Sequence, residues 1–195
     1  MNDLSTVLHS LRPGSEWVIY GAKYSGIKWL DENQTQPTEE ECVQKAAELE
    51  YQEEVNEYQR QRSVEYPSYP DQFDKIYHSG VTAWKAEIKV IKDKYPKATM
   101  DADVLQTRKD AAIFDLQTER YTAAIKRLEL DAVVASDDIP ATIEVFTTNS
   151  ENPETIESTT ETVANPVIVK DTEERAAAQA VVDATPQPVI DSLNN

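Results

Sequence analysis

The pattern of apolar and polar positions along the chain predicts a mainly helical protein. Between residues 39 and 65, apolar side chains recur every three or four positions and glutamates fill many of the others, which is typical of an amphipathic helix. Thr38 and Glu41 have the spacing of a capping box at its start. The same periodicity predicts a second long helix from about residue 101 to residue 130. The two helices could pair with each other or with other copies of the chain, and the sequence favours neither.

Two β-prone segments near the amino terminus predict a β-hairpin that follows a short helix. Residues 17–20 and 27–30 are rich in aromatic and β-branched side chains and flank a loop that ends at Gly26. Alternation places Trp17 with Ile19 on one face of the first strand, and Trp29 with Ile27 on one face of the second. We therefore expect residues 1–36 to form an amino-terminal module.

Residues 62–98, between the two long helices, form a unit rich in aromatic side chains and proline. Pro67 and Pro70 are expected to end one helix and to allow another to begin. Gly80 should break this new helix, and a third helix should end at Tyr95. Helical spacing places aromatic and aliphatic side chains on shared faces, so we expect a helical hairpin with an aromatic core. The predicted packing or protein-contact residues, two of them in the amino-terminal module, are Trp17, Trp29, Tyr66, Phe73, Tyr77 and Trp84.

The chain changes character near residue 131. Residues 1–130 hold 17 of the 19 Lys and Arg, and residues 131–195 hold 13 of the 36 Asp and Glu. Pro140, Pro153 and Pro166 recur every 13 residues, and this Thr-rich repeat predicts one short strand and a turn per unit, stacked or intertwined. The alternative is a disordered acidic linker. A short helix is expected over residues 172–184.

These patterns predict an α+β, mainly helical fold in three parts. Residues 1–36 form the module with the β-hairpin, residues 37–130 the helical region, and residues 131–195 an acidic tail with short β-repeats.

Charge and cysteine content exclude several classes of protein. The net charge of −17 and the pI of about 4.4 argue against nucleic acid as a partner, because neutralising phosphates requires clustered Lys and Arg. A single cysteine allows no internal disulfide and suits a reducing cytoplasm. We expect no membrane segment and no signal peptide, because no long apolar segment is present.

Residues with catalytic potential are few. His9 and His78 lie in unrelated surroundings, and each is better explained as a packing or surface residue. Cys42 follows three glutamates, which disfavour the thiolate that a nucleophile requires. Asp71 and Asp74 near a helix start are explained more simply by capping than by catalysis. We therefore expect no enzyme activity, no cofactor and no metal.

The aromatic unit resembles a module of small structural or assembly proteins of tailed bacteriophages, especially cyanophages and other marine phages. The residues that carry this resemblance are EYP (65–67), DQFD (71–74), IYH (76–78), Trp84, IK (91–92) and YPK (95–97). Phe73 stands where leucine is commoner in the family. The amino-terminal module resembles the same proteins at LRPG (11–14), EW (16–17), YSG (24–26), WLD (29–31), NQT (33–35) and PT (37–38).

This resemblance covers roughly residues 11–98 and implies a function in the phage particle. The expected protein is a tail component of the virion (fibre, baseplate or neck attachment), made in the host cytoplasm, that binds other phage structural proteins. A homo-oligomer is expected, and a trimer if the protein is a fibre. The alternative is a tail-fibre assembly chaperone that is not retained in the virion.

Overall fold

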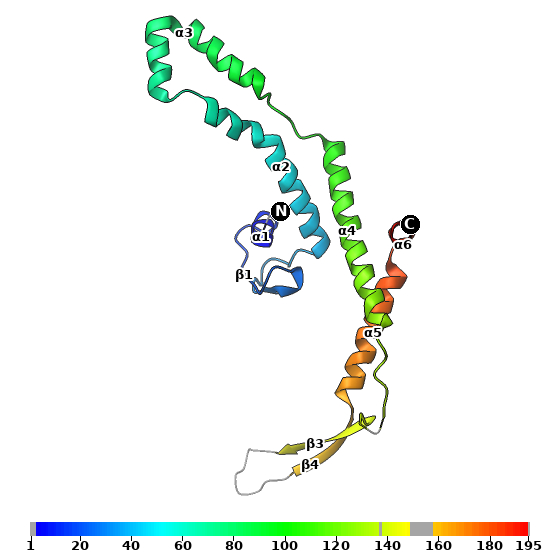
Figure 1. Ribbon diagram of the computed structural model, residues 1–195. Helices are drawn as coiled ribbons and strands as arrows, with labels where there is room; N and C mark the ends of the chain where they lie inside the picture. Colours follow the sequence, from blue (N-terminus) through cyan, green and yellow to red (C-terminus); the bar gives the residue numbers. More distant parts are fainter. Residues whose placement is uncertain (1–2, 137, 149–157, 195) are drawn as a thin grey trace. The chain divides into compact units, whose positions relative to one another are not determined.

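The computed structural model describes residues 3–136, 138–148 and 158–194. Its elements confirm an α+β, mainly helical fold (Figure 1). The chain divides into two compact units, Met1–Leu116 and Gln117–Asn195. This division lies within a long helix, whereas the change in composition suggested a boundary near residue 131. The predicted division into three parts stays a prediction.

The first unit begins with a helix and a β-hairpin that pack on a small core. Strands β1 and β2 are antiparallel, with Trp17 opposite Trp29 and Ile19 opposite Ile27. Within each strand these residues lie on the more buried face, as the alternation predicted. Val7, Leu8 and Cys42 form the buried centre of this module. Its elements are α1 (Leu4–Leu11), β1 (Trp17–Ile19), the 3₁₀ turn η1 (Tyr24–Gly26) and β2 (Ile27–Trp29).

Helix α2 (Glu39–Glu65) begins at the predicted capping box. Thr38 Oγ1 accepts a hydrogen bond of 3.1 Å from Glu41 N, and Glu41 Oε2 accepts one of 2.9 Å from Thr38 N. Both bonds satisfy amide groups that have no partner within the helix. The helix packs against α1 and has Cys42 in the shared core.

Helix α3 (Tyr69–Lys94) is interrupted at Gly80, as the sequence predicted. Gly80 has φ 78° and ψ 165°, a backbone conformation that essentially only glycine adopts. The interruption separates a first limb, residues 69–79, from a second limb, residues 81–94, and Figure 1 shows the chain changing direction between them. The helix ends before Tyr95, also as predicted.

Helix α4 (Ala102–Glu129) begins in the first unit, where its first turns contact α2. Tyr51 of α2 is buried, and its hydroxyl accepts a hydrogen bond of 3.1 Å from Asp101 N. The Arg108 guanidinium lies 4.5 Å from the centroid of the Tyr51 ring and donates two hydrogen bonds to Glu54, of 2.9 and 2.7 Å. The start of α4 therefore contacts α2 of the same chain, which the sequence left open.

The second unit contains a β-hairpin and two helices after the carboxyl-terminal part of α4. Strands β3 (Thr142–Thr148) and β4 (Ser158–Ala164) are antiparallel, with Ile143 opposite Val163. They are followed by α5 (Pro166–Ala184) and α6 (Gln187–Leu193). Figure 1 shows α5 beside the end of α4, where Arg127 donates hydrogen bonds to Asp171 and Glu174.

The prediction of stacked or intertwined β-repeats in the tail is met only in part by the described residues, and for the segment that begins at Pro166 it is wrong. The strands pair as a hairpin, and Pro166 begins α5 instead of a third strand. The cause is Asn165, whose Oδ1 accepts a hydrogen bond of 3.0 Å from Val167 N and so caps the helix. The expected helix at 172–184 is therefore the second part of a longer one. The middle proline, Pro153, lies outside the described residues.

Candidate protein-contact surface

Trp17 and Trp29 lie in the amino-terminal module, apart in sequence from the other four predicted contact residues. Both are partly buried and pack against the core of Val7, Leu8 and Cys42. Trp29 Nε1 donates a hydrogen bond of 2.7 Å to the carbonyl oxygen of Gln34. These contacts hold the β-hairpin on α1 and on the start of α2.

Several residues of the short motifs between residues 11 and 38 have structural contacts in this part of the chain. Arg12 Nε donates a hydrogen bond of 3.1 Å to Thr35 O, and the Tyr24 hydroxyl donates one of 2.8 Å to Pro37 O. A Cβ on Gly26 would lie 2.0 Å from Tyr20 O, so only glycine fits there. These motif residues therefore fix the path of the chain between β1 and α2.

The Gln72 side chain links the two limbs of α3 and the loop before them. Trp84 Nε1, in the second limb, donates a hydrogen bond of 3.1 Å to Gln72 Oε1. Gln72 Nε2 donates one of 2.7 Å to Pro67 O, in the loop before the helix. An ion pair of 3.3 Å between Lys75 and Glu87 is a second link between the limbs.

The end of α3 is attached to the end of α2. Arg62 Nε donates a hydrogen bond of 2.8 Å to Tyr95 O, and Arg62 Nη2 one of 3.1 Å to Lys92 O. Glu65 accepts hydrogen bonds from Lys94 and from the Tyr95 hydroxyl, and these bonds hold the pKa of Glu65 below its usual range. The α3 hairpin is thus tied to α2 at its base.

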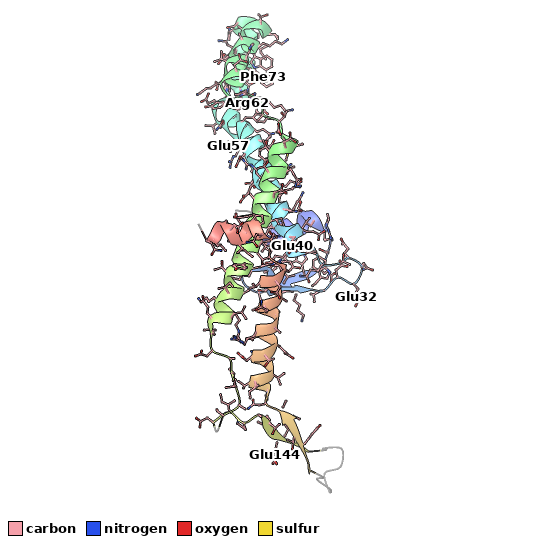
Figure 2. The ribbon with its side chains drawn as sticks, turned by 90° about the vertical axis from the view of Figure 1, so that its right-hand side faces the viewer. Glu32, Glu40, Glu57, Arg62, Phe73 and Glu144 are labelled. Carbon is pink, nitrogen blue, oxygen red and sulfur yellow. The ribbon has the colours of Figure 1, made fainter. Side chains whose placement is uncertain are left out.

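Three aromatic side chains on the first limb are exposed. Tyr69, Phe73 and Tyr77 follow one another at four-residue spacing and are 78%, 69% and 84% exposed. Phe73 is labelled on α3 in Figure 2. Tyr77 has an edge-to-face contact with the neighbouring His78, at 4.9 Å between ring centroids. We call these three residues the aromatic row.

The expectation of one aromatic core in this unit is therefore wrong for Phe73 and Tyr77. The links to the second limb come from Gln72 and Lys75, on one side of the first limb. Phe73 and Tyr77 each lie about 100° further around the helix than Gln72 and Ile76, on an exposed side. Tyr66 and Trp84 are partly buried. As contact residues for another protein, Phe73 and Tyr77 stay a prediction.

The second limb carries an exposed row of lysines. Lys85, Lys89 and Lys92 recur at i, i+4 and i+7, which places them on one face. Lys89 pairs with Asp93, whereas Lys85 and Lys92 form no ion pair with any residue that the structure describes. We call these three residues the lysine row. Sequence periodicity indicated the lysines, but it did not show that the neighbouring aromatic side chains are exposed.

The candidate chemical residues have structural or surface positions. Cys42 is 4% exposed, and burial, followed by the nearby Glu41 and Glu39, raises the pKa of its thiol to about 11. His78 Nε2 lies 3.3 Å from Asp74 Oδ1, and both side chains are exposed. Within residues 3–136, 138–148 and 158–194, no group of three or more His, Cys, Asp and Glu side chains is placed to hold a metal ion.

Comparison of the chain with known proteins identifies no relative. No protein-family model matches the chain, and comparison with curated proteins and with solved structures finds no match. None of the helices in the described part of the chain is long and apolar enough to cross a membrane. Function must therefore be inferred from the surface of the chain itself.

Proposed function

We propose that the protein is a structural component of a bacteriophage tail, such as a fibre, baseplate or neck attachment protein, and that it acts by protein–protein contact. The aromatic row on α3 is the observation that carries this proposal. Soluble monomers rarely expose neighbouring large aromatic side chains, and patches of this kind are typical of interaction sites. The resemblance of residues 11–98 to phage structural proteins supplies the context of that contact.

The α3 hairpin suits a contact surface because its backbone is held in place before binding. The bonds of Gln72 to Trp84 and Pro67, and of Arg62 to Tyr95, join the limbs to each other and to α2. A surface that is already ordered loses less conformational entropy when a partner covers it. Aromatic side chains also provide a large contact area with few rotatable bonds.

Mass spectrometry of purified particles tests this proposal. In gradient-purified virions of the phage that encodes the chain, we expect its peptides at a constant ratio to the major capsid protein. The same peptides in infected-cell lysate but not in particles would contradict the proposal and favour the tail-fibre assembly chaperone.

A variant phage tests whether the aromatic row makes the contact. Phe73→Ala combined with Tyr77→Ala should lower the copy number of the protein in particles at least 10-fold, while its level in lysate is unchanged. Ser79→Ala combined with Thr82→Ala is the matched control, because both residues are exposed on the same helix. Equal incorporation of the two double variants would exclude the aromatic row as the contact.

A further inference from the structure

The surroundings of the aromatic row differ in charge from the rest of the chain. Residues 62–98 contain seven Lys and Arg and five Asp and Glu, although the whole chain has a net charge of −17. The lysine row contributes three of these positive charges, all exposed on the second limb. A partner that covers this hairpin should therefore offer an apolar and acidic surface.

Helix α2 offers a surface of that kind. It contains nine glutamates and three basic residues. A shallow groove of about 400 Å³ along it is lined by Glu50, Glu53, Glu54, Glu57 and Arg60. A neighbouring hollow of about 480 Å³ adds Leu49, Thr6 and the uncharged polar side chains Gln52, Asn56 and Gln59. Carboxylates and an aliphatic side chain thus lie along the same part of α2.

We infer that the aromatic and lysine rows on α3 of one copy bind the acidic groove on α2 of a second copy of this chain. Lysines of one copy would face glutamates of the other, and the aromatic row would cover the region around Leu49. The two surfaces differ, and each copy carries both of them. A two-fold dimer would therefore contain this contact twice, and a ring would contain it once between each pair of neighbouring copies. This inference deepens the proposed function and rests on it, because it names the partner of the aromatic row.

The exposed area of the aromatic row could supply a large part of one partner's share of such an interface. Aromatic side chains bury roughly 150–250 Å² each, so the three residues of the row, 69% to 84% exposed, offer roughly 400 Å². A stable interface buries about 800 Å² on each partner. The aliphatic stems of the lysine row add apolar area beside their charges.

Light scattering coupled to size-exclusion chromatography of the full chain tests the inference. We expect the wild-type chain to elute as two or more copies, with an association that weakens as salt is raised. Lys85→Glu with Lys92→Glu, or Glu53→Lys with Glu57→Lys, should each weaken the association at least 10-fold. Lys23→Glu with Lys28→Glu is the charge-matched control on exposed residues of the amino-terminal module, and it should leave the association unchanged.

An equimolar mixture of the two reversed variants gives the decisive result. Each variant then meets a surface of opposite charge on the other, so association should return. A mixture that stays monomeric, a wild-type chain that is monomeric at every concentration, or reversed variants that associate like the wild type would each overturn the inference. So would binding of the hairpin to nucleic acid without self-association.

Further measurements distinguish a folding defect from a loss of association, and this inference from the proposed function. Circular dichroism should show the wild-type helical signal for every variant. If a reversed variant melts early, Phe73→Ala with Tyr77→Ala replaces it and should also abolish association. A monomeric chain that is nevertheless found in virions would reject this inference alone and would leave the proposed function intact.

Discussion

Trp84 Nε1 donates a hydrogen bond of 3.1 Å to Gln72 Oε1 and so joins the two limbs of α3 on either side of Gly80. Gln72 also donates to Pro67 O, at 2.7 Å. One glutamine side chain therefore connects the loop before the helix, the first limb and the second limb. The orientation of the exposed aromatic row depends on this link.

Replacing Trp84 should destabilise the hairpin far more than replacing Phe73. Trp84→Ala removes a partly buried indole and leaves Gln72 Oε1 without its donor, so we expect a loss of about 3 kcal/mol in the free energy of unfolding. Phe73→Ala should change it by less than about 0.5 kcal/mol, because that side chain is mostly exposed. Urea unfolding followed by circular dichroism measures both. Equal losses for the two variants would contradict the packing described for α3.

Gly80→Ala should destabilise the chain through the backbone alone. Apart from the adjacent backbone and the two neighbouring residues, no heavy atom of the described residues lies within 4 Å of a Cβ built on Gly80. The cost therefore comes from holding alanine at φ 78° and ψ 165°, about 1–3 kcal/mol. Thermal unfolding measures this loss. Ser79→Ala, at an exposed neighbouring position, is the control and should be nearly neutral. If Gly80→Ala unfolds at the wild-type temperature, the two limbs do not require the interruption of α3 at residue 80.

The helix ends were predictable because the chemistry that sets them is local. The capping box of Thr38, the fixed φ of Pro67 and the left-handed conformation of Gly80 each act within a few residues. The buried face of α3 was not predictable in the same way, because Phe73 and Ile76 are both apolar. The choice between them depends on how the second limb crosses the first, which the distant bond from Trp84 fixes.

The tail shows the same limit of local reasoning. Asn165-Pro166 fits the start of a repeat, and it fits equally well a helix cap followed by proline at the first helical position. In the structure Asn165 Oδ1 caps the helix by accepting from Val167 N, and Asn165 Nδ2 holds the capping side chain in place by donating a hydrogen bond of 2.8 Å to Pro140 O, 25 residues earlier. A pattern along the sequence contains no information about that contact.

Cys42 should react slowly with thiol reagents in the folded chain. Burial raises the pKa of its thiol from 9.0 to about 11, so at pH 8 the thiolate fraction should fall roughly 100-fold. Limited access to the buried sulfur should slow the reaction further. Reaction with a chromogenic disulfide at pH 8, compared with the chain unfolded in guanidinium chloride, measures the ratio. Similar rates in the two states would contradict the buried position of Cys42.

Glu48 should make stability depend on pH in the acid range. Hydrogen bonds from Lys45 and then Lys109 lower the pKa of Glu48 from its ordinary value of 4.5. The folded state therefore binds this proton less readily than the unfolded state, and the contribution is complete above about pH 4.5 and lost as the pH falls through the lowered pKa. Wild type should be more stable than Glu48→Gln at pH 7, and the two should converge in acid. If the stability difference between wild type and Glu48→Gln does not change with pH, this ion pair is not its source.

Asn165 should stabilise the second unit through two separable hydrogen bonds. Its Oδ1 accepts from Val167 N and caps α5, whereas its Nδ2 donates to Pro140 O. Asn165→Ala removes both and should cost about 1–2 kcal/mol, because Asn165 is buried and the loss leaves Pro140 O without its donor. Asn165→Ser keeps a capping oxygen and loses the amide that donates to Pro140, so urea unfolding should place it between wild type and alanine. If serine matches wild type, the bond to Pro140 contributes nothing measurable, and if serine matches alanine, the cap contributes nothing.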